Sequence, residues 1–146
     1  LRKFNFYNYL KKTFLNAKIP CLCICVGLQI LGKSSEENEE EVGLEAFNFK
    51  VKKLLGNNEN KIPHVGWNNV NFIKKFGQFE IKKKYDFYFD HSYAIFSSSK
   101  AIAYTHHTKK FVPIINYKNI LACQFHPEKS QENGLIFLKS FISYYG

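Results

Sequence analysis

The residue of this sequence with the clearest chemical potential is Cys25, which lies within residues 20–31. This run is apolar and rich in strand-forming residues up to Val26, meets Gly27, and then continues with helical spacing. A strand that turns directly into a helix lifts a nucleophile above the edge of an α/β sheet. Gly27 allows the tight turn and the approach of a substrate, and the helix N-terminus favours the thiolate of Cys25. The alternative is a buried strand whose cysteines act as small hydrophobic residues.

A histidine and a carboxylate stand two residues apart near the end of the sequence, in His126-Pro127-Glu128. A thiol needs a base to deprotonate it, and the base is often held by a carboxylate. Residues two apart on an extended segment face the same side, so we expect His126 and Glu128 to meet. Pro127 stiffens this segment and keeps it out of a helix. A lone His-x-Glu pair is weak evidence, but together with a cysteine at a strand–helix junction it indicates covalent catalysis by Cys25.

Length and composition indicate a single globular domain. The chain has 146 residues, of which 45% are hydrophobic and 17% aromatic, and this is enough to bury a core. Three of its four cysteines stand at alternate positions, Cys21, Cys23 and Cys25. That spacing suits neither a disulfide framework nor a zinc site. We therefore predict a reducing, cytoplasmic setting, with no metal and no other cofactor.

The net charge of +9 raises the question of a nucleic-acid partner. The lysines form only short clusters, however, and the chain is also rich in Asn, Ile, Phe and Tyr. A general compositional bias explains the charge, so we predict no nucleic-acid partner. No apolar run reaches the roughly 20 residues that a membrane-spanning helix needs, so we predict no membrane partner. The sequence begins at Leu1 and contains no methionine, which indicates a fragment or an altered start.

The apolar periodicity predicts an α/β fold. Predicted helices cover residues 3–17, 27–32 and 134–144, and predicted strands or extended segments cover 21–26, 42–55, 62–72, 85–89, 94–96, 101–105, 111–115 and 120–125. Residues 34–41 are predicted to form an acidic surface loop. The first half is thus predicted as helix–strand–helix and the second half as mostly antiparallel strand.

Four segments resemble known motifs. Residues 23–29 (C-I-C-V-G-L-Q) resemble the G-I-C-L-G-M-Q elbow of class I glutamine amidotransferases, and residues 124–130 (Q-F-H-P-E-K-S) resemble their Q-F-H-P-E-x-S segment. Residues 62–68 (I-P-H-V-G-W-N) and 87–93 (F-Y-F-D-H-S-Y) resemble V-P-H-M-G-W-N and Y-F-V-H-S-Y in one subgroup, the glutaminase subunits of imidazole glycerol phosphate synthase. The resemblance covers nearly the whole chain, in the family's order.

The resemblance implies a partial class I amidotransferase fold, with a mixed sheet flanked by helices. Residues 1–146 would be the C-terminal two-thirds of the family's glutamine amidotransferase domain. The first strands would be missing, as would the P-G-V-G loop that supplies oxyanion donors. Since one oxyanion donor can be worth on the order of 10²–10³ in rate, the resemblance puts the activity of this chain by itself in question.

The resemblance also implies roles for individual residues. Cys25 would attack glutamine and form a thioester, His126 would pass protons, Glu128 would orient His126, and the ammonia would go to a cyclase or synthase subunit in a heterodimer. The positions that would bind glutamine are Gly27, Gln29, Glu37, His91, Ser92 and Tyr93. The positions that would face the partner are Pro63, His64, Gly66, Trp67 and Asn68.

Several of these roles have alternatives. Gln29 could be an ordinary residue on a helix surface, Glu36 is nearly as plausible as Glu37, and Trp67 could belong to the core. His64 and His91 suit a structural role better than a catalytic one. The protein could also be a paralogue that supplies ammonia for amino-sugar synthesis, or a non-catalytic fragment that keeps only the partner surface.

Two residues depart from the family's motifs. Cys23 stands where the family has a glycine two residues before the nucleophile, and its side chain is expected to crowd the turn. Asp90 stands in place of an apolar residue on a strand that is expected to be buried.

Overall fold

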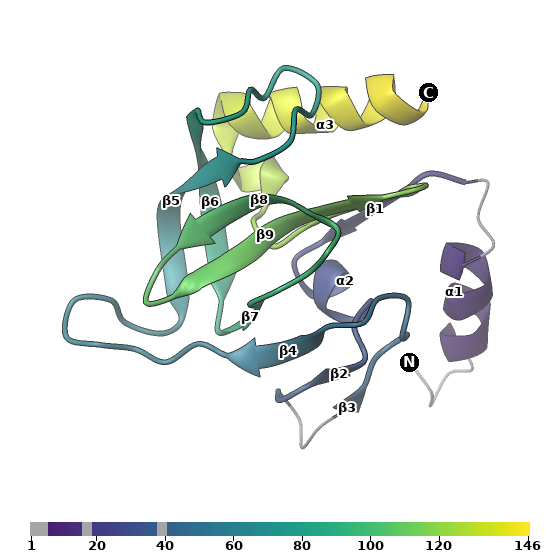
Figure 1. Ribbon diagram of the computed structural model, residues 1–146, viewed down its shortest axis with the longest axis horizontal. Coiled ribbons are helices and arrows are strands. Elements are labelled where there is room, and N and C mark those ends of the chain that lie inside the picture. Colours follow the sequence, from purple (N-terminus) through teal and green to yellow (C-terminus); the bar gives the residue numbers. More distant parts are fainter. Residues whose placement is uncertain (1–5, 16–18, 38–40) are drawn as a thin grey trace.

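Six strands form a curled, mixed sheet through the middle of the molecule (Figure 1). The computed structural model describes residues 6–15, 19–37 and 41–146. Across the sheet the strands are β1 (Cys21–Ile24), β10 (Ile120–Cys123), β9 (Lys110–Tyr117), β8 (Ala101–His106), β5 (His64–Phe72) and β6 (Lys84–His91). Only β1 and β10 are parallel neighbours, and the other pairs are antiparallel. This is the predicted mixed sheet, and its antiparallel part comes from the chain after residue 63.

The curl of this sheet brings its far edge close to the end of β10. The backbone N–H of His126, three residues after β10, donates to the carbonyl of Tyr88 on β6 at 2.9 Å. In strand order β6 and β10 are separated by three other strands. The end of β10 is therefore flanked by β1 on one side and reached by β6 on the other.

A smaller four-stranded sheet lies below, in the order β3 (Glu41–Val42), β2 (Ser34–Ser35), β4 (Lys50–Lys53) and β7 (Tyr93–Ile95). The predicted strand over 42–55 is therefore confirmed only in part: β4 lies within it, but a bent segment separates β4 from β3. Phe47 and Phe49 are buried because the loop itself packs into the core, which imitates the alternation of a strand. The predicted surface loop over 34–41 contains β2 and the start of β3, and residues 38–40 lie outside the described part.

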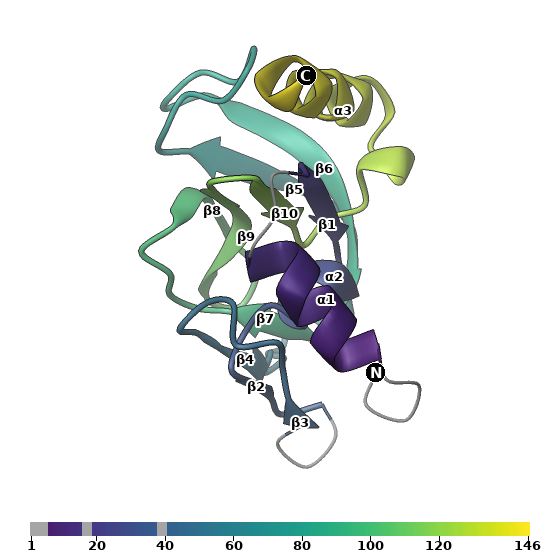
Figure 2. The ribbon, with the colours of Figure 1, turned by 90° about the vertical axis from the view of Figure 1, so that its right-hand side faces the viewer.

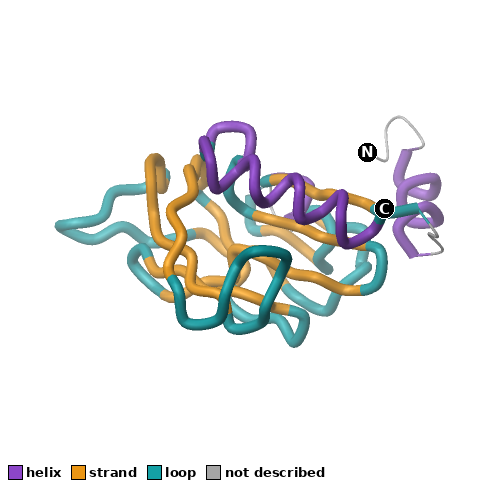
Figure 3. Tube along the Cα trace, turned by 90° about the horizontal axis from the view of Figure 1, so that it is seen from above, coloured by secondary structure: helices purple, strands orange, loops and turns teal. Residues whose placement is uncertain are grey.

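In the described part of the chain, three α-helices accompany the sheets: α1 (Phe6–Leu15), α2 (Val26–Gln29) and α3 (Gln131–Tyr145). The ends of the predicted helix over 3–17 lie outside the described residues. The second helix is shorter than predicted, and α3 begins three residues before the predicted Gly134. Figure 2 shows α1 in front of β1 and α2, and Figure 3 shows α3 lying over the strands.

The two faces of the large sheet bury different side chains. Facing α3 is a mostly aromatic cluster that includes Phe76, Phe79, Phe87, Phe125 and Phe137. The opposite face, toward α2 and the small sheet, packs a mostly aliphatic cluster that includes Cys23, Leu28, Val51, Ile95 and Ala122. Because β10 contributes residues to both clusters, it is buried on both faces, and its carboxyl end is fixed from all sides.

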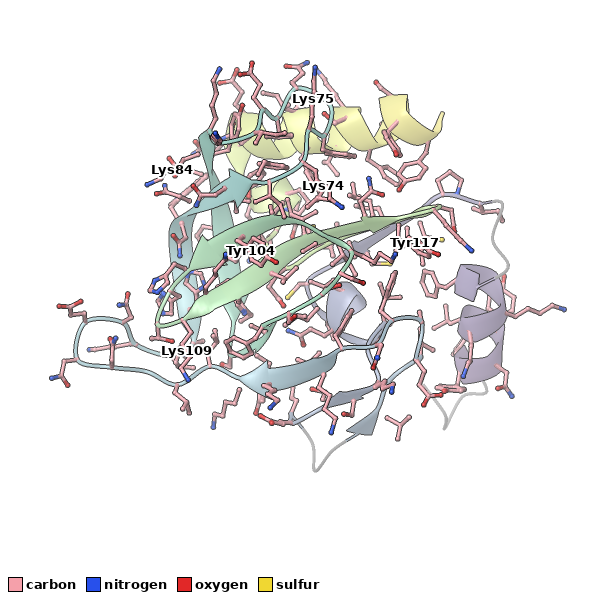
Figure 4. All side chains as sticks on the ribbon, viewed as in Figure 1. Lys74, Lys75, Lys84, Tyr104, Lys109 and Tyr117 are labelled. Atoms are coloured by element: carbon pink, nitrogen blue, oxygen red, sulfur yellow. The ribbon has the colours of Figure 1, made fainter. Side chains whose placement is uncertain are left out.

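The lysines are spread over several elements. Figure 4 labels Lys74 and Lys75 after β5, Lys84 at the start of β6 and Lys109 before β9, in different parts of the view. Lys110 lies over the Tyr104 ring at 3.9 Å from its centroid. The absence of a nucleic-acid partner stays a prediction. Among the described helices, none is both long and apolar enough to cross a membrane.

Candidate active site

Cys25 forms the turn between β1 and α2. Its φ of 49° is unusual for a residue other than glycine, and such a conformation persists only where its surroundings enforce it. Its N–H donates to the carbonyl of Cys123 at 2.8 Å, and its own carbonyl accepts the N–H groups of Leu28 and Gln29 at 3.0 and 3.3 Å. The predicted strand–turn–helix junction is thus present, with Cys25 at its apex.

The crowding expected from Cys23 does not occur. Cys23 is buried in the aliphatic cluster, and even a Cβ added to Gly27 would lie 3.4 Å from the Cβ of Cys23, which is an ordinary van der Waals contact. A side chain at position 23 is therefore compatible with the turn.

The helix N-terminus favours the thiolate of Cys25 as predicted, through the N–H of Val26, but the net shift of the thiol pKa is upward. Burial raises its pKa, and the carboxylates of Asp90 and Glu128 act in the same direction. The N–H of Val26 and the side chain of Gln124 lower the pKa, but they do not outweigh burial. A helix of four residues has too few aligned peptides to reverse this balance. The thiol therefore needs a base.

The side chains of His126 and Glu128 are in contact as predicted, but the backbone between them is helical rather than extended. The ring Nδ1 of His126 lies 2.7 Å from Oε1 of Glu128. Residues Pro127–Lys129 form a 3₁₀-helix, so the expectation that Pro127 keeps the segment out of a helix is wrong. Proline suits the first position of a helix, where its missing N–H is no loss. With Nδ1 held by Glu128, Nε2 is the nitrogen left for the thiol.

The backbone of His126 is fixed from two sides. Besides the bond to Tyr88, the carbonyl of His126 accepts the hydroxyl of Ser130 at 2.6 Å, and Ser130 Oγ accepts the N–H of Tyr88 at 2.9 Å. The carboxyl ends of β1 and β10 lie at the same edge of the sheet, so Cys25 and His126 follow neighbouring strands. Direct contact between Cys25 Sγ and His126 Nε2 stays a prediction.

Gln29 is a buried residue of the site, which excludes the alternative of a helix surface. It is 8% exposed, and its Nε2 donates to the carbonyl of Tyr93 and to Oε1 of Gln124, both at 3.1 Å. Both amide hydrogens are used within the protein. Only its side-chain oxygen is left to accept a bond from a substrate, such as one from an ammonium group.

Residues 91–93 make hydrogen bonds near the site mainly through their backbone carbonyls. The carbonyl of Tyr93 accepts Gln29, and the carbonyl of Ser92 accepts the N–H of Leu54 at 2.9 Å. The ring of His91 is buried and lies 3.0 Å from His64. Burial lowers the pKa of His91 to about 4. Its ring is therefore a neutral structural group.

The two glutamates after β2 have different surroundings. The carboxylate of Glu36 accepts the backbone N–H of Lys53 at 3.0 Å, so it holds the small sheet together. Glu37 is exposed and makes its hydrogen bond to Ser35 through its backbone. Glu37 remains the predicted substrate-binding residue of the pair.

The predicted partner segment, residues 63–68, has an exposed and a buried part. Pro63 is exposed, Gly66 is half-buried, and Trp67 is 49% exposed, edge-on to the ring of Tyr88. Trp67 is therefore not a core residue. His64 is only 3% exposed, so its assignment to the partner surface is wrong: its ring points inward, stacked on Phe89 and His107.

Asp90 is also placed differently from the prediction. Phe87, Phe89 and His91 are buried along β6, so the alternation of the strand turns Asp90 to the solvent. Its carboxylate lies 4.0 Å from Lys129 Nζ. Its backbone carbonyl lies 3.9 Å from Cys25 Sγ, which donates to it.

Sequence reasoning gave no role to Gln124 or Ser130. Gln124 is completely buried and its Nε2 lies 3.6 Å from Cys25 Sγ. The signal was present, because an amide stands in the apolar run 120–125, two residues before His126 and so on the same face. Within the described ranges, no group of three or more His, Cys, Asp or Glu side chains is arranged to hold a metal ion.

Comparison with known proteins gives consistent matches. The family "Glutamine amidotransferase class-I" matches residues 4–142. The "Imidazole glycerol phosphate synthase subunit HisH" of Blochmanniella floridana is 38% identical over 143 residues, which are 97% of this chain and 70% of the relative. Proteins with the same subunit name from Methanococcus maripaludis and Pyrococcus furiosus are each 42% identical, over 86% and 87% of this chain and 62% and 66% of theirs.

The chain thus spans about two thirds of the length of these curated relatives. Solved structures agree on the fold. A crystal structure described as a glutamine amidotransferase has a TM-score of 0.68 at 14% identity, covering 99% of this chain and 70% of that one. A glutamine amidotransferase from Thermotoga maritima has a TM-score of 0.59 at 20% identity, with 99% of this chain and 55% of that one covered.

Proposed function

This chain belongs to the class-I glutamine amidotransferase family, and from that premise we propose that the protein hydrolyses glutamine to glutamate and ammonia through a thioester on Cys25. The observation that supports this most is the pairing of two strand ends. Cys25 follows β1 in a turn with a φ of 49°, and after the neighbouring strand β10 the ring Nδ1 of His126 is held 2.7 Å from Glu128 Oε1. A thiol near a carboxylate-oriented imidazole is the arrangement that nucleophilic acyl transfer requires.

The proposed reaction assigns each proton to a named atom. His126 Nε2 takes the proton of the Cys25 thiol while the sulfur attacks the carboxamide carbon of glutamine. The tetrahedral intermediate collapses, the C–N bond breaks, and the imidazolium returns the proton to the departing ammonia. Water then attacks the thioester, again giving a proton to His126, and glutamate leaves as the thiol is restored. Glu128 stabilises the imidazolium in both steps.

We further propose that the ammonia passes to a cyclase or synthase subunit that makes imidazole glycerol phosphate in histidine biosynthesis. The support is the subunit name that the curated relatives share. The exposed Trp67 and Pro63 supply the proposed docking surface, because exposed aromatic residues often anchor interfaces. The four free cysteines fit a reducing, cytoplasmic setting.

Glutamate release by the full-length protein, with and without a purified synthase subunit, tests this proposal. We expect release that Cys25→Ser abolishes and that the cognate synthase stimulates. Turnover without stimulation by that synthase, but with stimulation by an amino-sugar synthase, would reassign the partner. No release under any pairing would favour a non-catalytic subunit.

A further inference from the structure

Gln124 occupies a special position behind the nucleophile. It follows β10 directly, its backbone N–H donates to the carbonyl of Pro113 at 2.8 Å, and its side chain is fully buried. Its amide therefore approaches Cys25 from the interior. A buried amide must have its hydrogen bonds satisfied, and one of its contacts is the sulfur itself.

We propose that Gln124 is a positioning residue, whose Nε2–H donates to Cys25 Sγ, holds the sulfur in place and stabilises the thiolate once the thiol has lost its proton. This inference rests on the proposed function, since it concerns the same nucleophile. The proposed contact, from Gln124 to the sulfur, is additional to the roles proposed for Cys25, His126 and Glu128.

The orientation of this amide is forced by its neighbours. The carbonyl of Tyr93 can only accept a hydrogen bond, so the atom of Gln29 that faces it must be Nε2. The same Nε2 faces Gln124 and needs an acceptor there, which must be Oε1. The remaining end of Gln124, Nε2, therefore faces the sulfur. An amide turned the other way would place two donors or two acceptors against each other.

A second set of contacts fixes Tyr93 independently. Nδ1 of His91 lies 2.8 Å from the Tyr93 carbonyl and must donate to it. His91 Nε2 is then an acceptor for His64 Nδ1–H at 3.0 Å, and His64 Nε2 accepts from Asn68 Nδ2 at 3.2 Å. Asn68 is oriented by its bond to the His106 carbonyl at 2.9 Å. The Tyr93 carbonyl thus receives two donors, one for each lone pair, and is held in place.

The consequence for the sulfur follows from its surroundings. A hydrogen bond to the charged form of a group favours that form. Burial and the carboxylates of Asp90 and Glu128 oppose ionisation of Cys25, so the donor from Gln124 offsets part of their effect. It acts while no substrate is bound and without any change of structure.

The test is the pH dependence of Cys25 alkylation in the full-length protein, with iodoacetamide as the probe and peptide mapping to separate Cys25 from the other thiols. We expect Gln124→Leu to raise the inflection by about one pH unit. Thr105→Val is the control for the general cost of losing a buried hydrogen bond, since it removes the one to the Asn69 carbonyl, away from the sulfur. We expect it to leave the inflection unchanged. An unshifted inflection in Gln124→Leu would overturn the proposal.

A second measurement does not depend on the folding of a variant. In the unmodified protein, the side-chain amide resonances of Gln124 should titrate with the same inflection as Cys25 alkylation. Resonances that stay constant through that inflection would also overturn the proposal. Neither experiment needs glutamine turnover, so a failed glutaminase assay and a failed Gln124 assignment give different results.

Discussion

His126, which follows β10, and the pair His64 and His91 on β5 and β6 have opposite surroundings. His126 keeps 20% of its side chain exposed and has the carboxylate of Glu128 at 2.7 Å. His64 and His91 are 3% and 6% exposed, and their ring nitrogens contact each other, an asparagine and a backbone carbonyl. At His126, the carboxylate of Glu128 can stabilise a positive charge on the ring. The pair His64 and His91 is held neutral by burial, so its nitrogens act only as fixed donors and acceptors.

The difference shows that a motif can identify a histidine without showing its role. Solvent exposure and a neighbouring carboxylate determine whether that histidine is suited to proton transfer. All three histidines belong to segments that resemble motifs of one family. Burial lowers the pKa of His64 to about 3 and that of His91 to about 4, with the neighbouring histidines adding to the effect on His64. Neither is suited to proton transfer near neutral pH. Four experiments can break or sharpen this comparison.

The largest loss of activity is expected from substitutions of Cys25 and His126. Cys25→Ala or His126→Asn should lower kcat/KM for glutamine hydrolysis by on the order of 10⁴-fold or more, because the nucleophile or its base is lost. The double variant should lose no more than either single one, since the two act as a unit. His91→Asn is the counterpart from the neutral pair, and it should cost far less. Equal losses for His91→Asn and His126→Asn would break the comparison.

A smaller effect is expected from Glu128→Gln. The variant keeps the shape of the side chain but cannot stabilise an imidazolium, so kcat should fall by on the order of 10²-fold. KM should change little, because Glu128 does not contact the proposed substrate. Steady-state assays at saturating glutamine measure this. Asp90→Asn, which removes the other nearby carboxylate, should keep most of kcat.

The neutral pair, His64 and His91, should make the free energy of unfolding fall in mild acid. Above the ordinary histidine pKa of 6.5, both the folded and the unfolded chains have these rings neutral, so the stability they contribute is fully present. As pH falls below 6.5, the unfolded chain takes up protons and the folded one does not, so stability is lost down to about pH 4 for His91 and 3 for His64. Between pH 7.5 and 5 we expect a loss on the order of 2 kcal/mol for each ring, or about 4 kcal/mol for the two together.

Urea unfolding at the two pH values measures this loss. His64→Asn should reduce the difference, whereas His106→Asn, at an exposed position, should not. A pH slope that is the same in both variants would show that the neutral pair does not titrate on unfolding.

The smallest effect on the chain itself is expected from Trp67→Ala. A buried tryptophan would cost about 3–5 kcal/mol, but Trp67 is 49% exposed, so the melting temperature should change little. Affinity for the synthase subunit should fall about tenfold or more, because an exposed aromatic anchor is lost. Ile73→Ala, also half-exposed but beyond the 63–68 segment, is the control. Lost stability with unchanged affinity would remove Trp67 from the interface.

The sequence predicted the parts of the site that depend on local spacing. Cys25 and Gly27 define the junction of β1 and α2 through neighbours in the chain, and His126 is close enough in sequence to Glu128 to meet it in either an extended or a 3₁₀ segment. The mixed sheet followed from apolar runs and from the family resemblance.

What could not be predicted depends on contacts between distant segments. Gln124 gains its role only because the curled sheet places it behind Cys25, 99 residues away in sequence. The segment over 42–55 imitates a strand because its phenylalanines fill the space beside α2. Asp90 was an avoidable error: its buried neighbours Phe89 and His91 already place it on the opposite face of β6.

The bond between His126 and Tyr88 has a consequence for the order of events in folding. In the site, Cys25 contacts Asp90, which is 65 residues away in sequence, and Gln124, which is 99 residues away. Closing such long loops is slow compared with forming local turns. During synthesis, Cys25 leaves the ribosome long before His126 exists. In the proposed mechanism the nucleophile therefore has no base until the curled sheet has closed.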